Sequence, residues 1–306
     1  MHTILVATDK PFAGVAVDGI KEIVKKAGFE LKLLEKYTSK EQLLDAIKNV
    51  DAVIVRSDIL DEQVIQAAGK LKIAVRAGAG YDNIDLKAAT AKGIVVMNTP
   101  GQNANAVAEL IFGAMIYLNR NFYNGSSGTE LRGKILGIQA YGHIGRIVGM
   151  IAKGFGMDVC AHDPYVDKII IENDGIRYVS NVRDLYSKCQ YVSVNLPANK
   201  ETKESINFDL LKLMPEGATL VNMARKELVH EPSLLKMFAG RKDFRYVTDV
   251  APDCQEQIKV EYPTRYYATP KKMGAQTEEA NINAGLAAAR QIVNFLTKGD
   301  KTFQVN

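Results

Sequence analysis

The chain has 306 residues, which is enough for two domains of ordinary size. Hydrophobic residues make up 47% of the sequence and charged residues 24%, the balance of a soluble globular protein. The net charge of +4 is too small to indicate a nucleic acid or an anionic membrane as partner, and it is compatible with a small anionic substrate.

The first hundred residues alternate short apolar runs with segments of helical period. We expect strands that contain TILVAT, LKLLE, AVIVRS, IAVRAG and IVVMNTP, and helices at 14–27, 40–49, 62–68 and 85–91. Strands rich in Val and Ile, each separated from the next by one helix, are typical of parallel βαβ units with helices on both faces of the sheet.

A helix over residues 103–121 follows, because apolar residues recur at helical spacing from Val107 to Leu118. After a polar loop at 124–128 a second βαβ series begins. Its strands are expected to contain KILGIQAYG, DVCAHDP, YVSVNLP, ATLVNMAR, FRYVTDV and RYYATP. A last helix is expected over 278–296.

This order predicts an α/β protein with two doubly wound parallel-sheet domains of the Rossmann or flavodoxin type and a cleft between them. One domain would comprise residues 1–100 plus 282–306, and the other residues 101–281.

The cysteines and the N-terminus indicate a cytoplasmic protein. Cys160, Cys189 and Cys254 lie far apart in the sequence without CxxC spacing, which favours buried free thiols over disulfides or a zinc site. The N-terminal apolar run is broken at once by Asp9 and Lys10, so it is expected to be a buried strand and not a signal peptide. No apolar run approaches the roughly 20 residues that span a bilayer.

A phosphate-binding turn is predicted where a strand meets a helix, in the stretch AYGHIGR. Gly142 and Gly145 match the second and third glycines of the GxGxxG fingerprint, while Ala140 replaces the first and must keep its backbone where a Cβ is allowed. Asp163 follows Gly145 by 18 residues, where a carboxylate accepts hydrogen bonds from ribose hydroxyls and repels a 2′-phosphate. Together these features favour NAD over NADP, although such a turn can also bind nothing.

Further polar residues end strands, where open α/β sheets bind their ligands. Arg225 could hold a substrate carboxylate, or it could cap a helix or lie on the surface. Asp249 could orient the nicotinamide amide, or it could cap the next turn. Arg56 and Ser57 end AVIVRS, and the glycine turn at 78–80 could cradle a carboxylate with backbone N–H groups or be a tight turn alone.

Five segments make the chain similar to a known family, and they occur in the family's order. They are VRAGAGYDNIDLKAA, VVMNTPGQNANAVAEL, AYGHIGR, VNMARKELV and GAQTEEANINA. The chain resembles the D-isomer-specific 2-hydroxyacid dehydrogenases over nearly its whole length, and within them a short D-3-phosphoglycerate dehydrogenase without a C-terminal regulatory domain.

The resemblance implies NAD-linked hydride transfer at C2 of a 2-keto or 2-hydroxy acid, as in the first step of the phosphorylated route to serine. The domain 1–100 plus 282–306 would bind substrate, the domain 101–281 would bind NAD, and the chain would form a homodimer. The matching motifs imply cofactor contacts from Tyr141, Gly142, His143, Ile144, Gly145, Asp163, Pro197, Thr202, Ala224, Asp249 and Gly274. They imply substrate contacts from Arg56, Ser57, Ala79, Gly80 and Asn105, with Arg225 binding the carboxylate and carbonyl.

The chain departs from the family at the catalytic acid. The family's TPHIGA is TPKKMGA here, and Cys254 stands at the position of the glutamate that supports the family's histidine, with Asp253 beside it. No histidine lies near this segment, since the four in the chain are His2, His143, His162 and His230.

Either the enzyme is inactive, or a lysine replaces the pair. A lysine ammonium has an ordinary pKa of about 10.4 and needs no carboxylate to fix its tautomer, so one change explains both losses. Lys272 takes the histidine position if the motif is counted back from Gly274, and Lys271 takes it if the count runs forward from Pro270.

The sequence is compatible with three functions. The chain could be a phosphoglycerate dehydrogenase, a glyoxylate or hydroxypyruvate reductase, or a binding protein that senses NADH without turnover. The sequence predicts no metal site.

Overall fold

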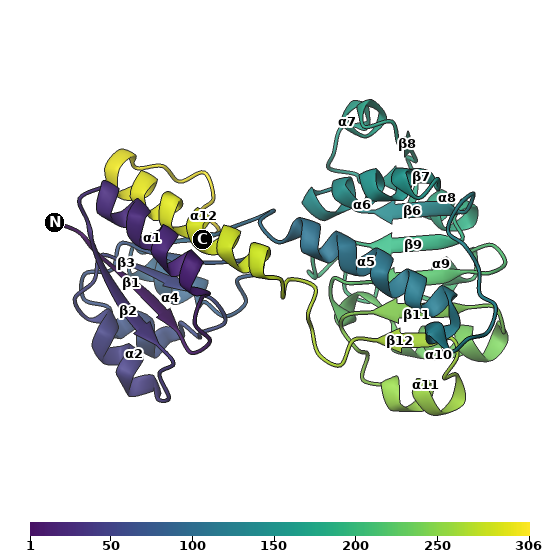
Figure 1. The fold of residues 1–306 in the computed structure, drawn as a ribbon, viewed down its shortest axis with the longest axis horizontal. Coiled ribbons are helices and arrows are strands. Elements are labelled where there is room, and N and C mark those ends of the chain that lie inside the picture. Colours follow the sequence, from purple (N-terminus) through teal and green to yellow (C-terminus); the bar gives the residue numbers. More distant parts are fainter. The chain divides into compact units, whose positions relative to one another are not determined.

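The computed structural model describes all residues from Met1 to Asn306 and divides into two compact units. Unit 1 holds Met1–Asn103 and Ala275–Asn306, and unit 2 holds Ala104–Gly274. Each unit is built on one parallel sheet (Figure 1), so the predicted α/β fold class is confirmed. The limits differ from the predicted boundaries, because residues 101–103 and 275–281 lie with unit 1, whose last helix begins at Glu278.

The five-stranded sheet of unit 1 has the order β2-β1-β3-β4-β5. Its strands are β1 (Thr3–Thr8), β2 (Glu30–Glu35), β3 (Ala52–Val55), β4 (Ile73–Arg76) and β5 (Val95–Asn98). The helices are α1 (Gly14–Lys26), α2 (Lys40–Ile47), α3 (Glu62–Ala67), α4 (Leu86–Ala91) and α12 (Glu278–Lys298).

Both faces of this sheet are buried, as the continuous apolar strands predict. Ile4 and Val6 pack in one core with α1 and α12, whereas Leu5 and Ala7 pack in the other with α2, α3 and α4. Alternate residues of β1 therefore serve opposite layers.

The seven-stranded sheet of unit 2 has the order β12-β11-β10-β9-β6-β7-β8. Its strands are β6 (Ile135–Gln139), β7 (Asp158–His162), β8 (Arg177–Tyr178), β9 (Tyr191–Val194), β10 (Thr219–Asn222), β11 (Arg245–Thr248) and β12 (Tyr266–Ala268). All its strand pairs are parallel, so every carboxyl end lies along one edge of the sheet and every amino end along the other.

The helices of unit 2 fall into two layers. One layer contains α5 (Ala104–Asn119), α6 (His143–Gly154) and α7 (Lys168–Asn173). The other contains α8 (Val182–Lys188), α9 (Phe208–Leu211), α10 (Glu231–Gly240) and α11 (Gln255–Glu261). Two single-turn 3₁₀ helices complete the unit, η1 (Asn121–Tyr123) and η2 (Lys226–Leu228).

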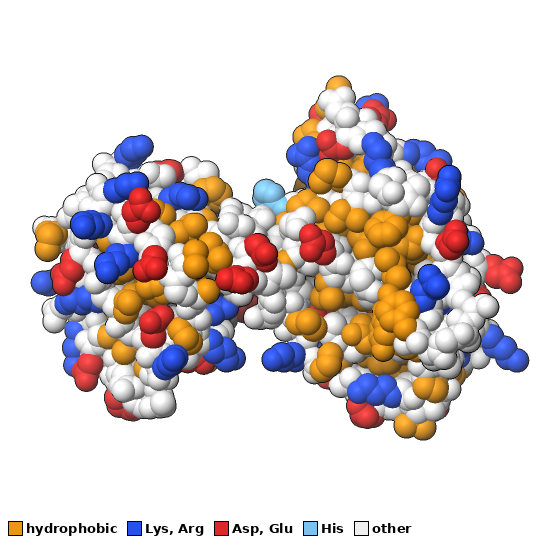
Figure 2. Space-filling model, viewed as in Figure 1, with side chains coloured by type: hydrophobic (Ala, Val, Ile, Leu, Met, Phe, Trp, Pro, Cys, Tyr) orange, Lys and Arg blue, Asp and Glu red, His pale blue; other side chains and the backbone are white.

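Figure 2 shows hydrophobic side chains gathered over α5 and α6 of unit 2. Tyr123, Met150 and Phe155 are exposed by 64%, 65% and 40%. No helix combines the length and the apolar character needed to cross a lipid bilayer.

The three cysteines are free, but two of them meet. The Sγ atoms of Cys160 and Cys189 lie 3.1 Å apart in the core of unit 2. Their separation of 29 residues hid this contact from the sequence.

Candidate active site

The turn between β6 and α6 has the form expected of a phosphate-binding turn. Gly142 is the N-cap residue of α6, whose first residue is His143. The expectation for Ala140 was wrong, because Ala140 adopts φ +73°, in the left-handed region that a Cβ disfavours. Two backbone N–H groups hold the strained turn: Ala140 N–H donates to the carbonyl of His162 over 2.9 Å, and Tyr141 N–H donates to the carboxylate Oδ2 of Asp163 over 2.8 Å.

The two glycines of the turn are required for different reasons. A Cβ on Gly145 would lie 2.4 Å from Ala140 O, so Gly145 is needed for close helix–strand packing. A Cβ on Gly142 would meet no protein atom within 4 Å, so the chain's own packing does not demand glycine there. An exposed glycine at the N-terminus of a 12-residue helix fits the close approach of a pyrophosphate.

The other predicted cofactor residues in and beside this turn differ in how deeply they are buried. Asp163 is 8% exposed, and its Oδ1 accepts a hydrogen bond from Tyr165 N–H over 2.8 Å. The Tyr141 ring is 1% exposed in the core, and its hydroxyl donates to Asp174 Oδ2 over 3.0 Å, so only its backbone belongs to the open turn. His143 is exposed and Ile144 is half-buried.

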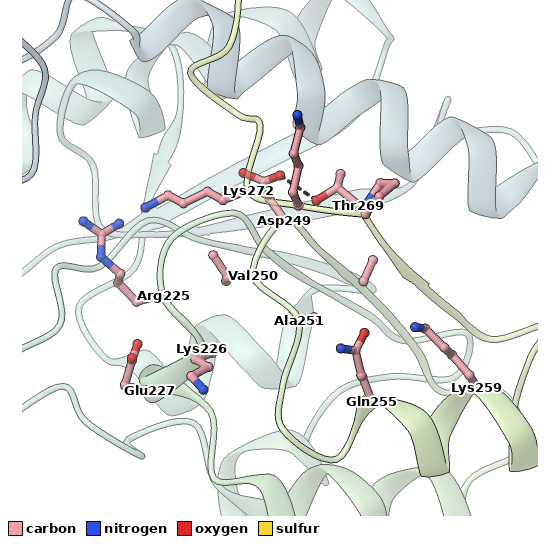
Figure 3. A pocket seen from close by; sticks show the side chains of 13 residues that line it. Arg225, Lys226, Glu227, Asp249, Val250, Ala251, Gln255, Lys259, Thr269 and Lys272 are labelled. Carbon is pink, nitrogen blue, oxygen red and sulfur yellow. Dashed lines mark hydrogen bonds between the residues drawn. The ribbon is translucent and has the colours of Figure 1, made fainter. Parts of the chain in front are cut away.

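A cavity of about 500 Å³ opens at the carboxyl ends of β10, β11 and β12 in unit 2 (Figure 3). Arg225, Asp249, Lys271 and Lys272, all predicted from the sequence, line this one cavity. The remaining lining residues are Lys226, Glu227, Val250, Ala251, Gln255, Lys259, Ala268, Thr269 and Pro270.

Asp249 fixes one wall of the cavity through hydrogen bonds. Its carboxylate is 2% exposed and receives three hydrogen bonds from the segment 269–274, which we call the lysine loop. Thr269 Oγ1 donates over 2.6 Å, Met273 N–H over 2.8 Å and Gly274 N–H over 2.8 Å. A Cβ on Gly274 would lie 3.0 Å from Asp249 Oδ2, so this glycine lets the loop close onto the carboxylate.

The two lysines are exposed, while Thr269 and Gly274 on either side of them are buried. In Figure 3 the Lys272 side chain extends toward the end of the cavity that holds Arg225. Arg225 is half-buried; its Nη1 donates to Ala224 O over 2.9 Å, and its own carbonyl accepts from Asn222 Nδ2 over 2.9 Å. The loop therefore presents cationic groups from an anchored base.

Two other cations of the cavity are neutralised nearby. Lys226 Nζ pairs with Asp253 Oδ1 over 2.6 Å, and this hydrogen bond raises the pKa of Lys226. Lys259 Nζ pairs with Glu256 Oε1 over 2.9 Å. Arg225, Lys271 and Lys272 are the other cationic residues that line this cavity.

Cys254 does not replace the family's glutamate as a charged group. Burial, together with the carboxylate of Glu231, raises the pKa of the Cys254 thiol to about 12, so it stays protonated at neutral pH. Glu231 accepts backbone hydrogen bonds from Asp253 N–H over 2.7 Å and Cys254 N–H over 2.9 Å. No histidine lines the cavity.

The remaining predicted cofactor residues of unit 2 lie in loops after β9 and β10. Thr202 Oγ1 donates to Pro197 O over 2.6 Å and ties that loop together. Ala224 N–H donates to Asn222 Oδ1 over 3.0 Å just after β10.

In unit 1 the predicted substrate residues follow β3 and β4. Arg56 is half-buried: its Nη1 donates to Lys10 O over 2.8 Å and Pro11 O over 3.0 Å, and its Nη2 donates to Asn281 Oδ1 over 2.5 Å. Arg56 therefore also joins the loop after β1 to α12. Ser57 beside it is exposed.

The glycine turn after β4 has a packing role. Gly78 has φ +152°, and a Cβ there would overlap the Arg76 guanidinium at 1.5 Å. Ala79 and Gly80 are partly exposed, and Ala79 O accepts from Asn98 Nδ2 over 2.6 Å. Asn105, the fifth predicted substrate residue, belongs to unit 2, where its Nδ2 donates to Glu109 Oε1 over 2.6 Å on α5.

Sequence reasoning missed Thr269 and Glu231, which shape the cavity wall through hydrogen bonds to residues distant in the sequence. The only signal for Thr269 was its place two residues before the lysine doublet, from which Pro270 separates it. No group of three or more His, Cys, Asp or Glu side chains is arranged to hold a metal ion.

Comparison with known proteins gives consistent matches. The family model for the catalytic domain of D-isomer specific 2-hydroxyacid dehydrogenases matches residues 12–306. A D-3-phosphoglycerate dehydrogenase from Methanocaldococcus jannaschii is 35% identical over 276 residues, which are 84% of this chain and 52% of that protein. The human D-3-phosphoglycerate dehydrogenase is 31% identical over 301 residues, 94% and 56% of the two chains. The chain spans about half the length of these relatives.

Solved structures match the whole chain. An NAD⁺-bound 3-phosphoglycerate dehydrogenase from Entamoeba histolytica is 48% identical with a TM-score of 0.89, covering 100% of this chain and 98% of that one. A D-2-hydroxyisocaproate dehydrogenase with 23% identity and a TM-score of 0.81, covering 99% of each chain, shares the fold.

Proposed function

The chain belongs to the D-isomer-specific 2-hydroxyacid dehydrogenase family, and from that premise we propose that it interconverts D-3-phosphoglycerate and 3-phosphohydroxypyruvate with NAD. The resemblance to phosphoglycerate dehydrogenases supports this substrate. A place at the entry to serine synthesis belongs to the same proposal.

One observation carries the proposal of an active enzyme. The cavity at the carboxyl edge of the unit 2 sheet gathers Arg225 with Lys271 and Lys272 in the absence of a histidine, and buried Asp249 anchors the loop that bears the lysines. A chain that had only lost its catalytic histidine would not need to keep the replacement on an anchored loop.

The residues of the cavity divide the work of ketone reduction. The Arg225 guanidinium binds the substrate carboxylate and polarises the C2 carbonyl, for which its planar fork is suited. An ammonium group of the lysine loop donates a proton to the ketone oxygen as the C2 carbon is reduced. We assign this proton to Lys272, because its side chain extends toward Arg225 (Figure 3). In the reverse reaction the neutral amine accepts the proton from the C2 hydroxyl.

A bound NAD supplies or accepts the hydride at C2. The turn at 140–145 suits its pyrophosphate, because Gly142 leaves open space at the N-terminus of α6. Asp163 suits its adenine ribose, since a carboxylate oxygen that accepts one backbone N–H still has a lone pair for a hydroxyl.

The distal phosphate is the feature that separates this substrate from unphosphorylated keto acids. We assign its recognition to Arg56 with Ser57 and Asn105, and carboxylate recognition also to backbone N–H groups at Ala79 and Gly80. Arg56 Nη1 donates to two carbonyls, which leaves Nε and one proton of Nη2 for an anion.

Following NADH oxidation with 3-phosphohydroxypyruvate and with hydroxypyruvate tests the proposal. We expect kcat/KM to be about 10²-fold or more higher with the phosphorylated substrate, because losing the phosphate leaves its charged partners unpaired. Equal kcat/KM values would favour a glyoxylate or hydroxypyruvate reductase. NADH binding without turnover of any 2-keto acid would indicate a sensing protein and contradict the proposal.

A cytoplasmic location and a homodimer complete the proposal. The apolar side chains over α5 and α6 of unit 2 (Figure 2) support a contact with a second copy, since large exposed apolar patches are typical of interaction surfaces.

A further inference from the structure

A second cavity, of about 390 Å³, lies at the opposite edge of the seven-stranded sheet from the proposed active site. Thr219, Tyr191 and Arg245 are the first residues of β10, β9 and β11, and Lys134 and Arg265 come directly before β6 and β12. We call this the amino-edge cavity. The other residues that line it are Asn121, Thr129, Gln190, Glu216, Gly217, Lys242, Asp243 and Thr264.

The charges of the amino-edge cavity are unbalanced toward the positive. Lys134, Lys242, Arg245 and Arg265 line it, against the carboxylates of Glu216 and Asp243. The ammonium groups of Lys134 and Lys242 make no ion pair or hydrogen bond, and the Arg245 guanidinium donates only to Asn119 Oδ1 over 3.4 Å. Glu216 is exposed at the rim of this cavity.

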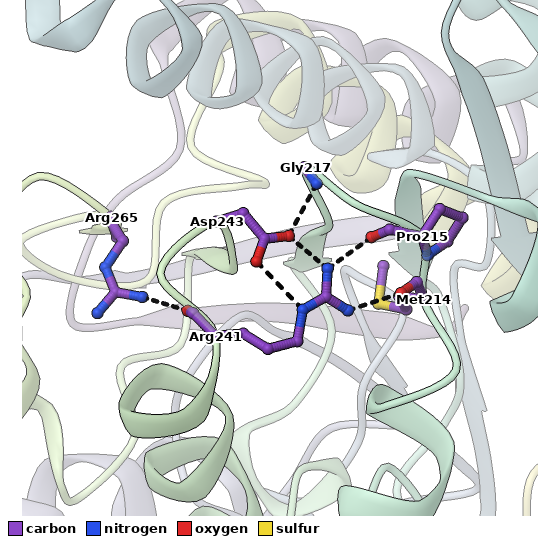
Figure 4. Close-up of polar contacts among 6 residues, drawn as sticks. All are labelled: Met214, Pro215, Gly217, Arg241, Asp243 and Arg265. Carbon is purple, nitrogen blue, oxygen red and sulfur yellow. Dashed lines mark hydrogen bonds and ion pairs between the residues drawn. The ribbon is translucent and has the colours of Figure 1, made fainter.

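The second carboxylate, that of Asp243, is already paired with Arg241, which does not line the cavity. Arg241 forms a two-pronged ion pair with Asp243 (Figure 4), and this hydrogen bonding lowers the pKa of Asp243. Asp243 Oδ2 also accepts from Gly217 N–H over 2.8 Å. Asp243 therefore has little attraction left for Lys134 or Arg245.

The same contacts make this wall rigid. Arg241 Nη1 donates to Met214 O over 2.6 Å and its Nη2 to Pro215 O over 2.7 Å, while Arg265 donates to Arg241 O over 2.6 Å (Figure 4). Arg265 also donates to Phe238 O over 3.0 Å and lies over the Tyr262 ring, with 4.6 Å between the guanidinium carbon and the ring centroid. A wall fixed in this way presents its cations without further ordering.

One residue that lines the amino-edge cavity has a buried hydroxyl without a partner. Thr219 is 1% exposed, and its Oγ1 has no hydrogen-bond partner in the protein. A buried hydroxyl without a partner costs about 1–3 kcal/mol, so such groups are rare unless something binds them. Thr219 starts β10, where it pairs with Tyr191 on β9 and with Arg245 on β11.

We propose that the amino-edge cavity binds a small oxyanion with two or more negative charges, of the phosphate or polycarboxylate class. The anion would receive charge-assisted hydrogen bonds from Lys134 and Arg245, with Lys242 at the rim, and a hydrogen bond from the Thr219 hydroxyl. This site is separate from the dehydrogenase cavity, because the two lie at opposite ends of the same strands, and it does not depend on the proposed function.

Titration of the 306-residue protein with inorganic phosphate tests this inference. Calorimetry at constant ionic strength, balanced with sodium chloride, measures the dissociation constant of wild type and variants in the presence of saturating NADH. We expect Lys134→Ala to raise the dissociation constant by about tenfold or more, as the loss of a charge-assisted hydrogen bond would. Thr219→Val should raise it by about threefold to tenfold, whereas Thr219→Ser should keep the wild-type value.

Lys21→Ala is the matched control, because Lys21 is an exposed lysine on α1 of unit 1. Arg56→Ala separates the two anion sites, since Arg56 belongs to the proposed substrate site and does not line the amino-edge cavity. Phosphate binding that weakens in Arg56→Ala and not in Lys134→Ala would overturn the inference. So would equal dissociation constants in wild type, Lys134→Ala and Thr219→Val, provided that the variants unfold at the wild-type temperature.

Discussion

Two buried aspartates of unit 2, Asp163 and Asp249, do similar work at two loops of the same sheet. Each follows the end of a strand and accepts hydrogen bonds from backbone N–H groups. Asp163 accepts one from Tyr141 in the nucleotide turn, whereas Asp249 accepts three hydrogen bonds, all from the lysine loop at 269–274. One carboxylate thus shapes the cofactor turn, and the other shapes the loop that carries the proposed proton donor.

A lysine can replace a histidine and its supporting glutamate if the backbone of its loop is held in place. A histidine needs a partner that fixes its tautomer, whereas a lysine needs only a fixed position. In this chain the support acts on the backbone: Asp249 holds Met273 and Gly274, and the thiol of Cys254 remains protonated. We therefore propose that Asp249 positions Lys272 through the backbone of this loop.

Of the exchanges at the two aspartates, Asp249→Asn is expected to have the larger effect on turnover. The amide would turn an N–H toward the Gly274 or Met273 N–H, so the loop would move away and take Lys272 with it. We expect kcat to fall by about 10²-fold, since a displacement of about 1 Å at a reacting group can cost that much. The NADH dissociation constant should change by less than about threefold, as expected when the transition-state interaction alone is lost.

Asp163→Asn should affect NADH binding more than turnover, the reverse of what is expected for Asp249→Asn. Asp163→Asn is expected to weaken NADH binding by about tenfold, the loss of a hydrogen bond to a charged group, with kcat within about threefold of wild type. Steady-state kinetics and NADH titration of both variants measure the split. If Asp249→Asn weakened NADH binding and left kcat intact, Asp249 would be a nicotinamide contact and the comparison would fail.

The turn that Asp163 supports could be predicted from the sequence, because the residues that identify it lie close together in the chain. Strand, glycine turn, helix and acidic residue follow one another within about 30 residues, which is the range in which sequence patterns are informative. The alternation of Val-rich and Ile-rich strands with helices predicted both sheets for the same reason.

The hydrogen bonds of Asp249 could not be predicted, although the residue itself was, because its partners become neighbours only through the order of strands in the sheet. Asp249 meets Thr269 across 20 residues and Gly274 across 25, and the sequence around Asp249 carries no sign of them. The amino-edge cavity depends still more on tertiary structure, since Lys134, Thr219 and Arg245 come from three different strand starts. The contact between Cys160 and Cys189 was hidden in the same way.

The smallest effect is expected at the Asp163 turn itself, from Ala140→Gly. Glycine relieves the left-handed backbone at φ +73°, where an alanine costs about 1 kcal/mol or more, but it also gives the unfolded chain more freedom. We expect the free energy of unfolding to rise by a few tenths to about 1 kcal/mol and NADH binding to stay within about twofold. Urea unfolding measures the change, and a clear loss of stability would mean that the turn is not strained.

The most direct test of the account is the turnover of Lys272→Ala, Lys271→Ala and the double variant with 3-phosphohydroxypyruvate and NADH. Lys272→Ala should lower kcat by about 10²-fold or more, the range for losing a general acid, while its NADH dissociation constant stays near wild type. A large loss of kcat in Lys271→Ala alone would identify Lys271 as the proton donor in place of Lys272. Wild-type turnover in all three variants would contradict the claim that an ammonium of this loop protonates the substrate.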